Sequence, residues 1–153
     1  MIHTQSADRP PVRFLDEGSS EQSLIANGCQ VAGRVVRSVL FPGVMVPRGA
    51  EVRDSIVMHD SVIGRDAIVD RAIVDKQVTI GDGARLGAGE ASTPNHACPD
   101  HLVSGLTLVG KGAQVPEGIT IGRNARIGAF VTVEDFTEDV PSGGVVDGPE
   151  SRH

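Results

Sequence analysis

Three side chains of the kind that bind metals stand close together near the middle of this sequence. His96, Cys98 and His101 are near enough along the chain for two or three of them to meet one ion. No second group of cysteine or histidine completes a tetrahedral ligand set, and a short cluster of this type more often belongs to an ordinary surface loop. We therefore predict no metal site.

A histidine beside an acid is the simplest candidate for proton transfer. His59 precedes Asp60 and could serve as a general base, with His96 and His101 as the other candidates. The glycine pairs at 81–83 and 87–89 resemble nucleotide-binding turns, but no Lys-Ser or Lys-Thr follows them. We read these glycines as chain corners and assign no catalytic residue.

Basic side chains are the third group that could do chemistry, because ammonium and guanidinium groups bind phosphate. They are frequent between residues 34 and 85, at Arg34, Arg37, Arg48, Arg53, Arg65, Arg71, Lys76 and Arg85. Each one alone fits an ordinary charged surface. Together they indicate a place where a phosphorylated anion could bind.

Bulk composition limits the classes of function. The 153 residues suit one domain, and the formal net charge of −6 argues against nucleic acid and anionic membranes as partners. No segment is apolar enough for a membrane span or a signal peptide, so we expect a cytoplasmic protein. The chain has no Trp or Tyr but has 19 Gly, which predicts a β-branched aliphatic core between frequent turns.

Large aliphatic residues recur every six positions, which is the main structural signal. In the second half they are Val109, Val115, Ile121, Ile127 and Val133. In the first half they are Ile25, Val31, Leu40, Val46, Val52 and Met58, then Ile63 and Val69, then Val74, Ile80 and Leu86, with one-residue slips between the groups. A second inward set includes Cys29, Val35, Val44, Ala50, Ile56, Val62, Ala67, Ile73, Val78 and Ala84.

A period of six fits neither an α-helix nor a hairpin meander. Three hexads close a triangular coil, so we predict an all-β fold, a single-stranded parallel β-helix or hexapeptide-repeat solenoid. Its left-handed sense is implied by similarity to known hexapeptide-repeat proteins. We expect a lead-in at 1–22, the β-helix at 23–134 with an inserted loop at 88–108, and a cap and tail at 135–153.

Side chains one coil apart should stack. We expect Asp54 over Arg71, Asp60 over Lys76, and Arg48 over Arg65. The first two are ion-pair candidates worth about 0–1 kcal/mol each. The two arginines repel unless an acid such as Asp82, one coil further, or a bound anion intervenes.

Several islands of sequence carry a resemblance to one family. They are Arg9-Pro10-Pro11, Gly28-Cys29, Ser38-Val39-Leu40, Pro42-Gly43-Val44, Asp54-Ser55-Ile56-Val57-Met58, Ile63-Gly64 and Ala72-Ile73-Val74-Asp75-Lys76. In this order they resemble the C-terminal β-helix of bacterial glucose-1-phosphate adenylyltransferases, which are sugar-phosphate nucleotidyltransferases. The resemblance covers residues 3 to 87, and the remainder is similar to less typical members of the same group.

The resemblance implies a non-catalytic domain for oligomerisation and allosteric regulation of an enzyme of ADP-glucose and glycogen synthesis. The family's nucleotide loop and Mg²⁺-binding aspartates belong to a separate catalytic domain, partnered in cis or in trans, so we expect no cofactor in this chain. The family implies self-association, commonly as tetramers, and sugar phosphate or phosphate effectors. Its Asp-Lys-Asn motif corresponds to Asp75-Lys76-Gln77, with Gln in place of Asn.

On this basis Lys76, Arg65, Arg71 and Arg48 are the candidate residues of an allosteric anion site. The alternative is a hexapeptide-repeat acyltransferase that uses a histidine base, because acyl transfer is the commonest use of this fold. His59, His96 and His101 are the bases available for it. Turnover of acetyl-CoA by the chain would support that alternative.

Overall fold

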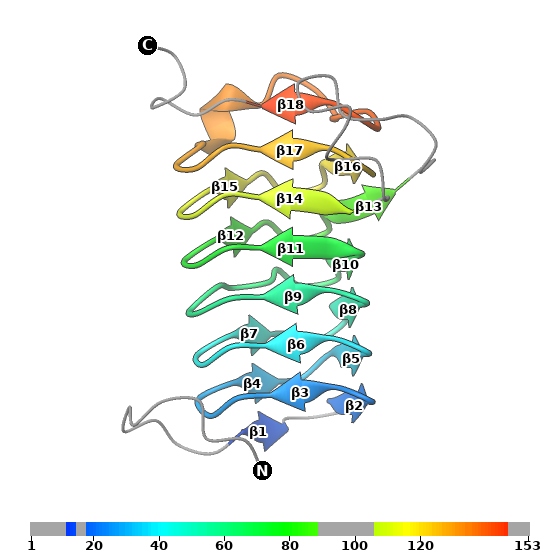
Figure 1. Cartoon of the computed structure of the whole chain (residues 1–153), viewed down its shortest axis with the longest axis vertical. Helices are drawn as coiled ribbons and strands as arrows, with labels where there is room; N and C mark the ends of the chain where they lie inside the picture. The colour runs from blue at the N-terminus through cyan, green and yellow to red at the C-terminus, as the bar shows by residue number, and fades with distance from the viewer. Residues whose placement is uncertain (1–11, 15–17, 89–105, 147–153) are drawn as a thin grey trace.

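The computed structural model describes residues 12–14, 18–88 and 106–146, and it shows a column of stacked triangular coils (Figure 1). All pairings between its strands are parallel. The coils form a left-handed β-helix of about seven turns, as the six-residue period and the similarity to hexapeptide proteins predicted. In the described part no helix is long and apolar enough to cross a membrane.

Each coil contributes short strands to three sides. The seven-stranded side holds β3 (Leu24–Ile25), β6 (Val39–Leu40), β9 (Ile56–Val57), β11 (Ala72–Val74), β14 (Thr107–Val109), β17 (Arg126–Ile127) and β18 (Val145–Val146). The six-stranded side holds β2 (Ser19–Glu21), β5 (Arg34–Val36), β8 (Glu51–Arg53), β10 (Ile68–Asp70), β13 (Arg85–Ala88) and β16 (Thr120–Gly122).

The third side is built from β1 (Arg13–Phe14), β4 (Gln30–Val31), β7 (Met45–Val46), β12 (Thr79–Ile80) and β15 (Gln114–Val115). Single bridges from Met45 to Val62 and from Val62 to Thr79 join its two groups of strands. A short 3-10 helix, η1 (Val133–Asp135), lies before β18. Paired strands extend beyond the predicted bounds of 23–134 at both ends, because β1 and β2 pair with β4 and β5, and β18 pairs with β17.

The corners of the coil share one backbone conformation. Residues with positive φ stack in columns at the corners, where the chain must turn sharply between two flat sides. The corner between the seven-stranded and third sides has Gly28, Gly43, Asp60, Gln77, Gly112 and Phe130 at such φ values. Glycine adopts this conformation without strain, and Asp or Asn adopts it more easily than other residues do.

The core is a stack of aliphatic side chains, as predicted, but five predicted members point outward. Val133 is 48% exposed in η1, and Met58, Ile56, Val62 and Ile73 are exposed or half-buried. The inward places in these coils belong to Val57, Ser55, Ser61 and Ala72, whose exposed fractions are 3 % or less.

A short corner explains this correction. In three successive coils the step from the six-stranded side to the seven-stranded side takes five residues, from Val35 to Leu40, from Val52 to Val57 and from Val69 to Val74. The slip therefore recurs at the same corner in these coils, whereas the step from Ile121 to Ile127 in a later coil takes six residues. The sequence pattern instead predicts one slip after Met58, and in that register the residues between 53 and 62 face the wrong way.

Buried serines occupy this short corner and bond the coils together. The Ser55 hydroxyl donates to the Arg53 carbonyl at 2.6 Å and accepts from the Ala72 N–H at 3.1 Å. Ser38 makes the same pair of bonds one coil earlier, with Val36 and with the Ser55 N–H. Each hydroxyl satisfies backbone groups that the tight corner leaves without a strand partner.

Candidate functional site

The predicted anion-binding residues are distributed over all three corners of the prism. Arg48 and Arg65 stack at the corner between the third and six-stranded sides, because the Asp66 N–H donates to the Arg48 carbonyl. Arg71 lies at the short corner. Lys76 lies at the corner between the seven-stranded and third sides. The structure therefore brings Arg48 and Arg65 together but does not bring Arg65 or Arg71 to Lys76.

Lys76 has a basic neighbour that the sequence reading missed. The Gly112 N–H donates to the Lys76 carbonyl at 2.9 Å, and this bond places Lys111 directly over Lys76 in the next coil. The two residues are 35 positions apart because the inserted loop intervenes. The signal was available, since Lys76 and Lys111 each stand two residues after an inward valine, Val74 and Val109.

The prediction that Asp60 lies below Lys76 is wrong by one position. The Gln77 N–H donates to the His59 carbonyl at 2.9 Å, so Gln77 lies over Asp60 and Lys76 lies over His59. The predicted Asp60–Lys76 ladder is therefore replaced by a column of His59, Lys76 and Lys111. The displaced register slip described above accounts for the error.

Two lysines, Lys76 and Lys111, lie one coil apart at this corner, beside the carboxylate of Asp75. Both lysines are exposed, and neither has an ion-pair partner among the residues described. The Asp75 carboxylate accepts a hydrogen bond from the Lys76 backbone N–H at 2.7 Å. Strands in adjacent coils are about 4.8 Å apart, so the two ammonium groups repel unless an anion lies between them.

His59 has the geometry of a packed side chain. Its ring lies 5.2 Å from the Phe41 ring at an angle of 64°. Its Nδ1 atom is buried and has no hydrogen-bond partner in the described structure. A general base is normally oriented through its second nitrogen by an acid or a carbonyl, and no described group does this for His59.

The Arg48 corner already has an acid in place. The Asp82 carboxylate lies one coil beyond Arg65, as expected, and accepts a hydrogen bond from the Arg65 N–H at 2.8 Å. A hollow of about 220 Å³ opens beside Arg48, lined by Ala32, Gly33, Arg34, Gly49, Ala50 and Glu51 as well. The Glu51 carboxylate in this wall pairs with Arg34 at 3.7 Å and opposes anion binding there.

At the short corner the charges are neutralised by one another. Arg37 donates two hydrogen bonds to the Asp54 carboxylate, at 2.7 and 3.0 Å. This hydrogen bond, with the charges of Arg37 and Arg71, lowers the pKa of Asp54. The same hydrogen bond and the negative charge of Asp54 raise the pKa of Arg37. Arg71 stacks over Asp54 as predicted, since its N–H donates to the Arg53 carbonyl. Arg71 therefore faces a carboxylate rather than a free anion site.

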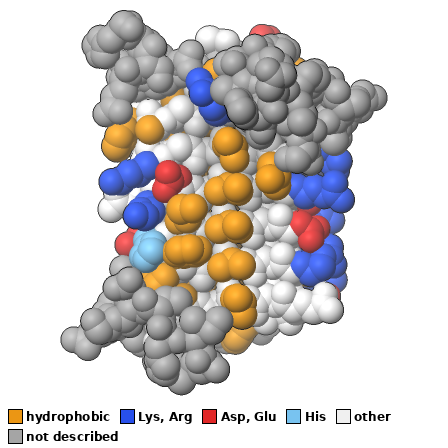
Figure 2. Space-filling model, in the orientation of Figure 1, with side chains coloured by type: hydrophobic (Ala, Val, Ile, Leu, Met, Phe, Trp, Pro, Cys, Tyr) orange, Lys and Arg blue, Asp and Glu red, His pale blue; other side chains and the backbone are white. Residues whose placement is uncertain are grey.

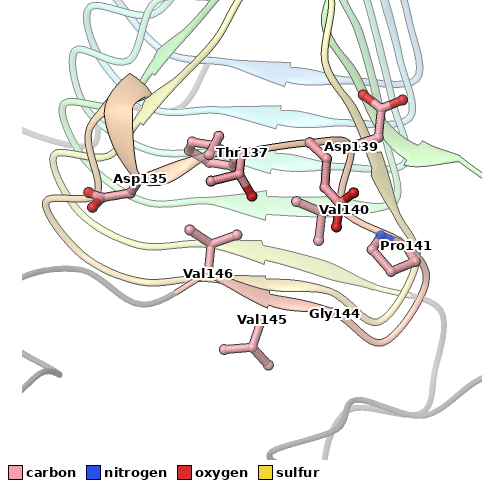
Figure 3. Close-up of a pocket in the computed structure, with 10 residues that line it drawn as sticks. Asp135, Thr137, Asp139, Val140, Pro141, Gly144, Val145 and Val146 are labelled. Carbon is pink, nitrogen blue, oxygen red and sulfur yellow. The ribbon is translucent and has the colours of Figure 1, made fainter.

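A hollow on the last coil is lined by acidic residues. It measures about 520 Å³ and runs between η1 and β18 (Figure 3). The carboxylates of Asp135 and Asp139 lie at opposite ends of it, with Val140 and Val146 between them. Such a lining does not favour phosphate.

The described residues contain no group of three or more metal-type ligands. His96, Cys98 and His101 lie outside the described residues, so the expectation that they hold no metal stays a prediction. The same holds for His96 and His101 as acyl-transfer bases. Among the predicted anion-site residues, Lys76 stacks on a second cation, Lys111, and neither lysine has an ion pair in the described structure.

The geometry defines a hexapeptide-repeat β-helix with a basic corner, and comparison with known proteins gives the family. Residues 10–98 match the family described as GlmU-like, C-terminal hexapeptide, and the chain belongs to that family.

Curated relatives are named glucose-1-phosphate adenylyltransferase. The chain is 53% identical to the one from Thermomicrobium roseum over 147 residues, which cover 95% of this chain and 34% of the relative. It is 43% identical over 135 residues to the one from Acetivibrio thermocellus, covering 88% and 32%. For Thermotoga neapolitana the identity is 37% over 144 residues, covering 94% and 34%. The chain spans about a third of the length of these relatives, and the resemblance seen in the sequence is confirmed.

Proposed function

We propose that this chain is the regulatory and self-associating β-helix of a glucose-1-phosphate adenylyltransferase-like enzyme. In this proposal it performs no chemistry itself and acts with a nucleotidyltransferase domain, in cis or in trans, in cytoplasmic ADP-glucose and glycogen synthesis. The relatives' names support the parent activity. The catalytic groups and any Mg²⁺ belong to that other domain.

The observation that carries the regulatory part is the stack of Lys76 and Lys111. Two lysines one coil apart, neither of them in an ion pair in the described structure, suit an anion with several charged oxygens. A phosphate or a phosphorylated sugar has this chemistry. Lys76 is one of the four residues predicted for the site. The other three, Arg65, Arg71 and Arg48, lie at other corners, and Lys111 is the second cation of the site instead.

Regulation follows if the anion binds one arrangement of β-helix and catalytic domain more tightly than another. A ligand shifts such an equilibrium only by its difference in affinity for the two arrangements. A site on a rigid corner is suited to this, because the β-helix moves as one body while its contacts with a second domain change.

The test measures binding of inorganic phosphate to the 153-residue chain by titration calorimetry at low ionic strength. Lys76→Ala and Lys111→Ala should each weaken phosphate binding at least about tenfold, since each removes one of two charge-assisted contacts. Arg65→Ala is the matched control, because it removes a cation from another corner. In the enzyme with its catalytic domain, Lys76→Ala should also abolish activation by sugar phosphates and inhibition by phosphate.

Equal phosphate binding by the wild type and by Lys76→Ala would contradict the assignment. A loss with Arg65→Ala as large as the loss with Lys76→Ala would also contradict it, since it would indicate a general charge effect.

A further inference from the structure

An unbroken line of aliphatic side chains runs up the outside of the seven-stranded side (Figure 2). We call it the aliphatic row, and in pairing order its outward residues are Leu24, Val39, Ile56, Ile73 and Leu108, followed by Arg126 and Val145. Leu24 is 53% exposed and Ile56 is 36% exposed. A row of this kind on a flat sheet is unusual, because an outward strand face in contact with water is normally polar.

A second column on the same side changes from large to small along the axis. Backbone hydrogen bonds align Phe41 with Met58, then with Asp75, Gly110 and Gly128. Phe41 and Met58 make a ridge on the earlier coils, whereas the two glycines leave a hollow of about 410 Å³ on the later coils. Met58, Ile73 and Leu108 are also part of its wall.

The ridge and the hollow lie on opposite halves of one side, so the side is complementary to itself. We propose that two copies of this chain pack their seven-stranded sides face to face, antiparallel, about a two-fold axis between the Ile73 and Leu108 positions. The inference rests on the self-association in the proposed function and names its surface. A closed two-fold dimer requires such a self-complementary patch.

The proposed arrangement makes specific contacts. Ile73 of each copy meets Leu108 of the other, and Met58 enters the hollow beside Gly128. Asp75 faces Gly110 of the second copy, and Arg126 of that copy faces Ile56, one coil and one column from Asp75, so the two charges of opposite sign lie on neighbouring coils. Leu24 makes no contact in the proposed dimer, because its end of the aliphatic row extends beyond the last coil of the opposing copy.

The test compares three lysine substitutions in the 153-residue chain by sedimentation velocity, with circular dichroism to verify the fold. Ile56→Lys places a charge inside the contact and should raise the dimer dissociation constant at least about tenfold. Val62→Lys is the matched control, because Val62 is 38% exposed but lies on the third side. Leu24→Lys tests the position of the two-fold axis, because Leu24 lies outside the proposed contact. It should change the dimer dissociation constant less than threefold, although Leu24 is more exposed than Ile56.

Three results would contradict the inference. A wild-type chain that sediments as a monomer, or an Ile56→Lys dimer of unchanged affinity, shows that a different partner or surface is involved. An effect of Leu24→Lys as large as that of Ile56→Lys rules out the antiparallel axis. Phosphate binding measured on the same Ile56→Lys sample separates this failure from failure of the Lys76 corner, since the two sites use different side chains.

Discussion

At the scale of single residues, a charged side chain in an ion pair contributes to stability, whereas one without an ion pair is available to bind a ligand. On the six-stranded side several charges are paired: Arg34 lies 3.7 Å from both Glu21 and Glu51, and Arg53 lies 3.7 Å from Asp70. Exposed pairs of this kind contribute little each. Lys76 and Lys111 are the contrasting case, and this makes them the better candidates for a ligand.

The Arg37–Asp54 pair gives a prediction about pH. The folded pKa of Asp54 is lowered, so its contribution to stability is present above the unfolded value and is lost as pH falls through the folded pKa. Asp54→Asn should therefore reduce the free energy of unfolding at pH 7, and the difference from wild type should shrink below about pH 4. Urea unfolding at pH 7 and pH 3 measures this.

Glu117→Gln is the control, because Glu117 is exposed and has no ion pair in the described structure. A difference for Asp54→Asn that is the same at both pH values would show that the pair is not responsible.

At the scale of elements, the coils approach so closely that some positions exclude any side chain. A Cβ atom on Gly64 would lie 2.5 Å from the backbone carbon of Gly81 in the next coil. Gly81 in turn lies against Pro116 and Glu117 of the coil beyond it. These glycines follow an inward aliphatic residue and allow the strands to stack at their normal spacing.

Gly64→Ala should therefore destabilise the chain by about 1–3 kcal/mol, as overpacking does, since backbone must move to admit the methyl group. Thermal and urea unfolding measure the loss. Gly118→Asn is the control, because Gly118 has open space around it and Asn tolerates its positive φ of 67°. An unfolding free energy for Gly64→Ala equal to that of the control would show that the coils can separate at no cost.

At the scale of the whole molecule, the β-helix is one continuous core in which each coil contacts its neighbours. The buried aliphatic stack extends from Val31 in the early coils to Val131 and Val140 in the last. In such a solenoid, stability is close to a sum over coils and the interfaces between them. A cavity in a central coil weakens its interfaces with both neighbouring coils.

Leu86→Ala should cost about 2–5 kcal/mol, because Leu86 is 1% exposed and lies in a central coil. Arg85→Ala, the exposed neighbour on the same strand β13, should change stability by less than about 0.5 kcal/mol. Denaturant midpoints of the two variants test the contrast. A loss below about 1 kcal/mol for Leu86→Ala would mean that the central coils are loosely packed.

The sequence alone was sufficient for the architecture, because an inward residue every six positions is a local property of a chain that turns three times per coil. It also gave the stacking of Arg48 on Arg65 and of Arg71 on Asp54, which follows from counting residues within uninterrupted coils.

The tertiary structure decided which residues face outward and which stack across the inserted loop. Val52-Arg53-Asp54-Ser55-Ile56-Val57 can be read in two registers, because both Ile56 and Val57 are aliphatic, and only hydrogen bonding to the adjacent coils selects the one with Ser55 inside. Lys111 reaches Lys76 for the same reason. Its place is set by the coil on which it stacks and not by its distance along the chain.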